Sequence, residues 1–266
     1  MDKIKVGFIG VGHMGSAIVE GMSKSDYFKN LEIFGFDHYP QGMESLNKNG
    51  QIITPVNDLN DLIKQADVIF LAIKPQGLAD FAKEIQPSQA LLKDKTFISM
   101  LAGTDVATLS QYIKAKNIIR IMPNVNASIG KSTIAVNYLN DSTNYDDLLS
   151  SFGTIFKIPE SQFDVFTGVS GSGPAIVFLM IDSLANAAVY QGMNKKTATD
   201  LVAAMVEASG EYTIEKLKGT DLNARNLVDI VSSPGGTTVK AIMSLERNKF
   251  EASMNEAIDV MMPKKN

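Results

Sequence analysis

A turn rich in serine, glycine and threonine, late in the chain, is the first stretch whose residue types could do chemistry. Gly235 and Gly236 stand between a Ser-Pro turn and an apolar-periodic run that begins at Val239, which predicts a loop followed by a helix. Glycine leaves backbone N–H groups uncovered, and a helix start adds free N–H groups and a positive dipole end, so the stretch can bind a carboxylate. Hydroxyl groups that donate and accept hydrogen bonds surround it, from Ser232, Ser233, Thr237 and Thr238. Taken alone, the stretch is more typical of an ordinary capped helix after a tight turn.

A second chemically informative stretch lies near the start of the chain. The residues from Gly10 to Gly15 read G-x-G-x-x-G between an expected strand at Lys3–Ile9 and a helical pattern, the arrangement that binds dinucleotides. Gly10 makes the tight turn, Gly12 lets a pyrophosphate approach, and Gly15 lets the helix pack on the strand. We therefore expect a nicotinamide dinucleotide here rather than a purely structural turn.

An acidic residue at the end of the second expected strand supports the same interpretation. Asp37 follows the strand Leu31–Phe36, at the place where an acid commonly holds the ribose hydroxyls of the adenosine half. Its carboxylate would accept hydrogen bonds from a 2′-hydroxyl and repel a 2′-phosphate, and no arginine follows it. We predict from Asp37 that NADH is at least usable.

The elements that must position these residues alternate between strands and helices through the first half of the chain. Besides the two strands above, we expect strands at 66–73, 96–100, 118–121 and, weakly, 132–136, helices at 57–65 and 145–156, and a last short strand at 156–158. Parallel strands joined by helices form a doubly wound, Rossmann-like α/β sheet whose ligands lie at the carboxyl ends of the strands. After residue 163 the pattern becomes helical, with helices expected at 174–189, 196–217, 222–230, 238–246 and 250–261. We therefore divide the chain into an α/β domain at 1–163 and an all-α domain at 164–266.

Composition argues against several classes of protein and site. The 266 residues carry a net charge of −4, which gives no basic surface for nucleic acid or an anionic membrane. The chain has no cysteine and only two histidines, so disulfides and thiolate catalysis are excluded and no metal site is expected. The N-terminus lacks the apolar core of a signal peptide, and no apolar run approaches the roughly 20 residues of a membrane span. We expect a soluble cytoplasmic protein.

The first helix of the second half is apolar almost all round. The residues from Ala175 to Ala188 leave little polar face, which is typical of a helix buried on several sides. A domain of roughly 100 residues does not easily cover such a helix alone, so we expect a subunit interface. A nicotinamide cofactor implies hydride transfer, and the helical half has no histidine to act as acid or base. That favours a substrate needing little proton help, such as a cyclic imine.

Five motifs together resemble those of the pyrroline-5-carboxylate reductase family, and they follow the family's order along nearly the whole chain. The motifs are Phe8–Gly15, Ala72–Gln76, Met122–Asn124, Gly171–Ala175 and Ser233–Glu246. The resemblance implies a Rossmann domain, a helical dimerisation domain, and reduction of 1-pyrroline-5-carboxylate to L-proline with NADPH or NADH. It also implies a homodimer, with dimers assembled into decamers in some members.

The resemblance also assigns residues to the cofactor and to the substrate. With Asp37, the cofactor contacts would fall on Ile9, Gly10, Val11, Gly12, His13, Met14, Asn57, Ala72, Ile73, Lys74, Pro75, Met100, Leu101 and Ala102. The substrate loop would fall on Ser233, Pro234, Gly235, Gly236, Thr237 and Thr238, with Thr238 as the catalytic residue that donates or orients a proton. We expect the backbone N–H groups from Gly236 to Thr238, and not an arginine, to hold the substrate carboxylate.

One departure from the family pattern and two alternative functions accompany this interpretation. Val125 and Asn126 stand where the family usually has Thr-Pro, so a hydroxyl and a rigid proline are lost beside the cofactor. The β-hydroxyacid dehydrogenases share the two-part layout, but they place a lysine where this chain has Val177. A nucleotide-binding regulatory protein without activity is the other alternative; the altered loop favours it and the intact Ser-Pro-Gly-Gly-Thr-Thr turn opposes it.

Overall fold

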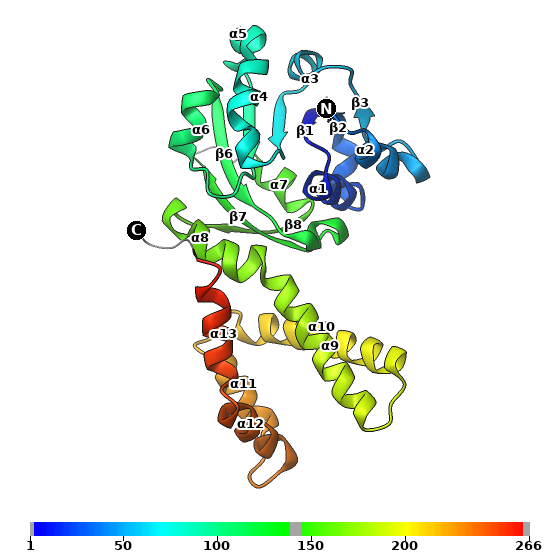
Figure 1. Ribbon diagram of the computed structural model, residues 1–266, viewed down its shortest axis with the longest axis vertical. Helices are drawn as coiled ribbons and strands as arrows, with labels where there is room; N and C mark the ends of the chain where they lie inside the picture. Colours follow the sequence, from blue (N-terminus) through cyan, green and yellow to red (C-terminus); the bar gives the residue numbers. More distant parts are fainter. Residues whose placement is uncertain (1–2, 139–144, 263–266) are drawn as a thin grey trace. The chain divides into compact units, whose positions relative to one another are not determined.

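The computed structural model describes residues 3–138 and 145–262, which fall into two compact units (Figure 1). The first unit is Met1–Pro174 and the second is Ala175–Asn266. This division and the predicted boundary at residue 163 both fall on one continuous helical stretch, Glu160–Tyr190.

A single eight-stranded sheet forms the centre of the first unit, in the order β3-β2-β1-β4-β5-β6-β7-β8. The strands are β1 Ile4–Ile9, β2 Leu31–Phe36, β3 Thr54–Pro55, β4 Val68–Leu71, β5 Thr96–Ser99, β6 Asn117–Met122, β7 Ser132–Tyr138 and β8 Gly153–Lys157. Neighbours pair in parallel except β6 and β7, which are antiparallel. The doubly wound α/β class expected from the sequence is confirmed, with two reversed strands, β7 and β8, added at one edge.

Helices cover both faces of this sheet, because its central strands are apolar on both sides. On β4, Val68 and Phe70 pack with α1 and α2, whereas Ile69 and Leu71 pack with α3, α4 and α6. Successive side chains of a strand point to opposite faces, and parallel sheets are buried on both. The helices of this unit are α1 His13–Ser23, α2 Gln41–Leu46, α3 Leu59–Gln65, α4 Leu78–Glu84, α5 Gln89–Leu92, α6 Val106–Tyr112 and α7 Asp146–Ser150.

The prediction of a helix over 145–156 is wrong in its second half. Helix α7 ends at Ser150, and Gly153–Lys157 instead forms β8, which pairs in parallel with β7. The β-branched Thr154 and Ile155 suit a strand. At Gly153 a Cβ atom would lie only 2.1 Å from the carbonyl oxygen of Ser132, so glycine is required for this pairing.

The second unit is helical, as expected. In the first unit, α8 Phe163–Phe166 and a π-helical turn at Thr167–Gly171 lead to α9 Gly173–Tyr190, most of which belongs to the second unit. The other helices of the second unit are α10 Lys195–Leu217, α11 Ala224–Val231, α12 Thr237–Arg247 and α13 Phe250–Asp259. Its buried apolar side chains, among the described residues, are Ala185, Ala198 and Val202. Large apolar side chains of α9 and α10 are exposed, including Leu179 at 67% and Ile214 at 74%.

One helix of the described residues, Glu160–Tyr190, is long and apolar enough to cross a membrane, with a mean hydropathy of 1.5. The sequence-based expectation that no stretch approaches such a length considered uninterrupted apolar runs, and the helix includes acidic residues such as Asp182. Length and composition are its only membrane-like properties, and only 6% of its most apolar window is buried. Its exposed apolar surface needs another surface to shield it from water.

Candidate functional site

The glycine-rich loop between β1 and α1 has the backbone that a dinucleotide needs. Gly10 has φ +90°, and a Cβ atom there would lie 2.7 Å from the carbonyl oxygen of Ala72. At Gly15 a Cβ atom would lie 2.4 Å from the carbonyl oxygen of Gly10, so α1 can pack on the loop only through glycine. Gly12 is exposed and has no heavy atom within 4 Å of a Cβ position, so its backbone is open to a pyrophosphate. The backbone requires glycine at positions 10 and 15 and is open at Gly12, which is compatible with the roles predicted from the spacing.

Asp37 holds this loop in place. One oxygen, Oδ2, accepts a hydrogen bond from the Val11 N–H at 2.6 Å, and Oδ1 accepts one from the Tyr39 N–H at 2.9 Å. The sequence suggested only a ribose contact for Asp37 and missed this second task. An ionised carboxylate has about four acceptor positions, so half remain for ribose hydroxyls.

A cavity of about 1000 Å³ opens beside this loop, between α1 and α2. Of the residues predicted to bind the cofactor, it is lined by Val11, Gly12, His13 and Asp37. Gly42 of α2 closes against the loop, since a Cβ atom there would lie 1.9 Å from the carbonyl oxygen of Val11. His13 is exposed at the start of α1, as the motif predicts.

The other predicted cofactor residues follow the neighbouring strands along the same edge of the sheet. The Ala72 N–H donates to the Ile9 carbonyl at 2.8 Å, and the Met100 N–H donates to the Leu71 carbonyl at 3.3 Å. The segments Ile9–Met14, Ala72–Pro75 and Met100–Ala102 therefore begin side by side where β1, β4 and β5 end. No residue of Ala72–Pro75 or of Met100–Ala102 lines the cavity between α1 and α2. Asn57 is exposed just before α3, whose first turn is capped by Asp58.

The loop after β6, where the sequence departs from the family pattern, is organised by buried Asn124. Its Nδ2 donates to Thr133 Oγ1 and to the Ser170 carbonyl, both at 3.0 Å, so it joins β7 to the π-helical turn. Its Oδ1 accepts from the Asn126 N–H at 3.1 Å. A proline at 126 has no N–H, so this chain replaces the lost ring constraint with a hydrogen bond. The sequence did not single out Asn124; its place in Met-Pro-Asn was the available signal.

The Ser-Pro-Gly-Gly-Thr-Thr turn lies between α11 and α12 in the second unit. Gly235 has φ +71°, which favours glycine, and the Gly236 N–H donates to the Ser233 carbonyl at 3.0 Å. At Gly236 a Cβ atom would lie 2.4 Å from Ser233 Oγ. Gly236 is the N-cap of α12 and has no side chain to cap it, so the backbone N–H groups from Thr237 onward point out of the first turn without a side-chain acceptor.

Two hydroxyl groups border this helix start. Thr238 is half-buried in the first turn of α12, and Ser232 Oγ is buried without a hydrogen-bond partner in the described part of the chain. An ion pair between Arg225 Nη2 and Glu246 Oε1, at 2.7 Å, joins α11 to α12 at the far end of both helices. The unit thus presents backbone donors and free hydroxyls together, as a small carboxylate requires.

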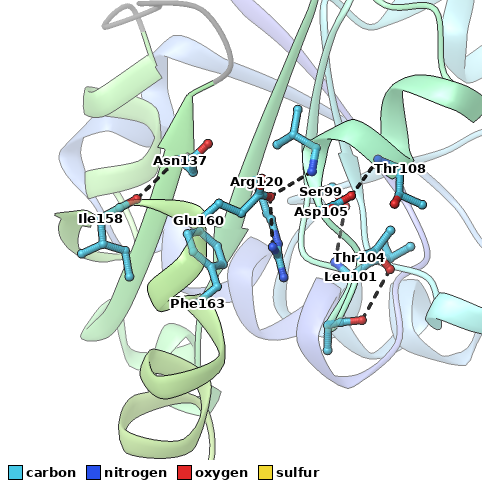
Figure 2. A network of polar contacts seen from close by, with 12 residues as sticks. Ser99, Leu101, Thr104, Asp105, Thr108, Arg120, Asn137, Ile158, Glu160 and Phe163 are labelled. Carbon is cyan, nitrogen blue, oxygen red and sulfur yellow. Dashed lines mark hydrogen bonds and ion pairs between the residues drawn. The ribbon is translucent and has the colours of Figure 1, made fainter. Parts of the chain in front are cut away.

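A network of polar contacts lies behind the loop that follows β5 (Figure 2). Arg120 of β6, only 4% exposed, is within 3.0 Å of Glu160, whose Oε1 also accepts from the Val106 N–H at 2.9 Å. Asp105 caps α6 by accepting from the Thr108 N–H at 2.7 Å. The hydrogen bond from the Thr108 side chain, with those of the backbone and the nearby Arg120 charge, holds the pKa of Asp105 below its usual value. The sequence analysis did not identify this network.

Comparisons with known proteins match both units. Residues 160–266 match the family described as pyrroline-5-carboxylate reductase dimerisation, and residues 5–103 match NADP oxidoreductases that depend on coenzyme F420. Among curated relatives, the pyrroline-5-carboxylate reductase of Methanosarcina acetivorans is 31% identical over 97% of this chain and 95% of its own. That of Escherichia coli is 34% identical over 99% and 97%. The chain belongs to the pyrroline-5-carboxylate reductase family.

Solved pyrroline-5-carboxylate reductases share the fold over the whole chain. The enzyme of Plasmodium falciparum with NADP bound is 29% identical and covers 98% of this chain and 96% of its own, with a TM-score of 0.82. That of Streptococcus pyogenes is 32% identical and covers 98% and 97%, with a TM-score of 0.78. The resemblance inferred from the five motifs is confirmed. Val177 lies on α9.

Proposed function

We propose that this chain reduces the C=N bond of 1-pyrroline-5-carboxylate to give L-proline, with NADPH or NADH as hydride donor. The observation that carries the proposal is that one chain has both an open dinucleotide loop at Gly12 and an uncapped helix start at Gly236, and that this chain belongs to the family over its full length. When bound, the nicotinamide supplies the hydride. The residues of this chain bind the cofactor and the substrate, orient the C=N bond and assist the protonation of its nitrogen.

The substrate carboxylate binds the backbone N–H groups of Thr237 and Thr238; the Gly236 N–H, which the sequence also suggested as a donor, already donates to the Ser233 carbonyl. The start of α12 offers these donors and the positive end of a helix dipole, and an anion there needs no cationic side chain. The only arginines of the second unit are Arg225 and Arg247; Arg225 is paired with Glu246, and Arg247 lies in the last turn of α12. Ser233 fixes the turn through its carbonyl and supports the carboxylate with its hydroxyl.

Thr238 orients the ring nitrogen of the imine. Its hydroxyl lies in the first turn of α12, next to the backbone donors, where it can donate a hydrogen bond to that nitrogen. The carbon of the C=N bond accepts the hydride, and the nitrogen gains a proton or arrives as the iminium. Threonine is a poor acid, so Thr238 acts by orientation or by relaying a proton from water.

A second copy of the chain covers the apolar helices of the second unit. Phe178 and Leu179 of α9 and Met205 and Ile214 of α10 are exposed, and residues 160–266 match a dimerisation family. Such a surface is not stable in water on a monomer. A homodimer, rather than a lipid bilayer, therefore accounts for the apolar stretch Glu160–Tyr190, and the protein works in the cytoplasm. Larger assemblies would be built from such dimers.

The activity is tested by following NAD(P)H consumption by the purified protein. The substrate panel contains 1-pyrroline-5-carboxylate and several 3-hydroxy acids, the latter with oxidised cofactor. We expect turnover with the imine and none with the hydroxy acids. Turnover of the hydroxy acids alone would support the dehydrogenase alternative, and binding of NADH without any turnover would support the inactive regulatory protein.

The site is tested by substituting Thr238. Loss of one hydrogen bond of this kind typically removes about 2–4 kcal/mol of transition-state stabilisation. We expect Thr238→Ala to lower kcat by roughly 10²-fold with unchanged cofactor binding, and Thr238→Ser to retain much of the rate. If Thr238→Ala keeps full activity and an unaltered KM, the turn is only a helix start and the site assignment fails.

A further inference from the structure

A row of polar side chains crosses three strands of an otherwise apolar part of the sheet. Ser99 of β5, Arg120 of β6 and Asn137 of β7 are register partners, so they point to the same face (Figure 2). Arg120 is the only charged residue fully buried in the sheet among the described residues. Its strand neighbours Ile119 and Ile121 are completely buried on the opposite face.

Both ends of this row are tied to loops. At one end, Ser99 Oγ accepts from the Leu101 N–H at 3.3 Å, in the segment that follows β5. At the other end, Asn137 Nδ2 donates to the Ile158 carbonyl at 3.3 Å, just before Glu160. The two ends of the row thus each hold one segment, the loop that follows β5 and the residues just before Glu160.

Glu160 links Arg120 to the start of α6. Its Oε1 accepts from Arg120 Nη1 at 3.0 Å and from the Val106 N–H at 2.9 Å. Val106 is the first residue of α6, whose N–H has no partner inside the helix. Phe163, completely buried, lies under the guanidinium, with 4.5 Å between Arg120 Cζ and the ring centroid. A carboxylate three residues before Phe163 thus caps the helix that ends the loop after β5.

This ion pair joins the buried guanidinium of Arg120 to a Glu160 side chain that is 30% exposed, and such a pair adds little to stability. Replacing one with apolar side chains of similar volume is often neutral or stabilising, because desolvation offsets the attraction between the charges. Here Arg120 Nε is also buried without a hydrogen-bond partner in the described structure, which adds to the cost. An isoleucine, as at the neighbouring positions of β6, would fill the strand without that cost. The arrangement is therefore better explained by the segments that it holds in place than by a contribution to the stability of the fold.

What the network holds is the loop at the end of β5. In a doubly wound sheet the first half of the strands takes the adenosine and the second half, to which β5 belongs, takes the other nucleotide. We propose that Arg120 and Glu160 are positioning residues for the nicotinamide: they fix the loop Met100–Thr104 by holding the first N–H of α6. The inference rests on the proposed function, and it predicts a selective effect on the nicotinamide half of the cofactor.

Three variants, at Val106 and at Glu160, test the proposal. Val106→Pro removes the N–H that donates to Glu160 and replaces the buried Val106 side chain with an apolar ring. Proline is tolerated at the first helical position, and Asp105, with φ −79° and ψ 167°, has a backbone compatible with a following proline. Glu160→Ala removes both bonds, and Glu160→Gln keeps a carbonyl acceptor for Val106. The matched control is Lys157→Met, which breaks the ion pair between Lys157 and Asp146 in the same unit without touching the loop.

The readouts are the single-turnover rate of hydride transfer and the Kd values of NADH and of ADP, which lacks the nicotinamide. We expect Val106→Pro and Glu160→Ala to slow hydride transfer about 10-fold and to raise the Kd of NADH several-fold, with the Kd of ADP within twofold of the wild type. Glu160→Gln should recover most of the rate, and Lys157→Met should leave every value unchanged.

Three outcomes would overturn the proposal. Wild-type hydride transfer and NADH binding in both folded variants would show that the network does not act on the cofactor. A rise in the Kd of ADP as large as that of NADH would show a general structural role, as would an equal effect in Lys157→Met. If the wild type does not reduce the imine but the variants still separate NADH from ADP binding, the proposed function fails and the positioning role stands.

Discussion

The two hydrogen bonds to Asp37 make cofactor selectivity the most quantitative prediction for this protein. The carboxylate uses one acceptor position for the Val11 N–H and one for the Tyr39 N–H. About two positions remain for the 2′- and 3′-hydroxyls of an adenosine ribose. The substitution Asp37→Ser removes these together with the negative charge.

The expected change in selectivity follows from these contacts. A hydrogen bond to a charged group contributes about 1.5–3 kcal/mol, so loss of the one to the 2′-hydroxyl lowers kcat/KM for NADH by roughly 10- to 100-fold. NADPH gains in comparison, because its 2′-phosphate no longer meets a carboxylate. The glycine-rich loop loses its anchor in the same variant, but that affects both cofactors alike and cancels from their ratio.

The assay is kcat/KM for NADH and for NADPH, in the wild type, Asp37→Ser and Asp37→Asn. We expect the ratio of NADH to NADPH to fall by at least 10-fold in Asp37→Ser and by less in Asp37→Asn, which retains one acceptor. A wild type that strongly prefers NADPH, with the ratio unchanged in both variants, would refute the reasoning. In that case Asp37 would serve only to hold the glycine-rich loop through its hydrogen bonds.

The remaining predictions concern assembly and stability. Sedimentation at low micromolar concentration should show a dimer, because the apolar side chains of α9 and α10 need a cover; a well-folded, active monomer would contradict it. In the first unit, burial raises the pKa of Asp146, but the hydrogen bonds from Lys157 and Tyr138 outweigh it and hold the pKa below its usual value. Asp146 therefore contributes stability above the ordinary pKa of about 4, and that contribution is lost as the pH falls through the lower, folded value. Chemical denaturation of Asp146→Asn should show a loss of at most about 1 kcal/mol at neutral pH that shrinks below pH ~4, and a loss independent of pH would exclude this origin.

The parts of the site that the sequence predicted are those set by local backbone requirements. Gly10, Gly12 and Gly15 are spaced by the geometry of one turn, so their roles could be assigned before any contact was known. The hydrogen bond from the Val11 N–H to Asp37 could not be predicted in this way, because the Val11 N–H comes within reach only when β1 and β2 pair. The strand β8 was not predicted in full for the same reason, since its pairing with β7, which precedes α7 in the chain, leaves no trace in local apolar periodicity.

The Arg120 network left a signal in the sequence that was overlooked. A single arginine inside the apolar run Ile118–Ile121 is unusual for a strand buried on both faces. It indicates a buried charge and therefore a partner, but not which acid provides it. Glu160 is forty positions away along the chain, and it becomes the partner because β7, β8 and the following turn bring it back across β6.

The second unit has a very small core of its own, formed from Ala185, Ala198 and Val202 with partly buried neighbours. In the proposed homodimer, much of the free energy that folds its helices would come from contact with the other subunit, so folding and association would be one equilibrium. Dilution would act on this unit as a denaturant does, and its melting temperature would rise with protein concentration. The first unit, with large apolar clusters on both faces of its sheet, would melt at a temperature that concentration does not change. Because the turn from Ser233 to Thr238 belongs to the second unit, the proposed substrate site would be lost at protein concentrations where the dinucleotide loop is still folded.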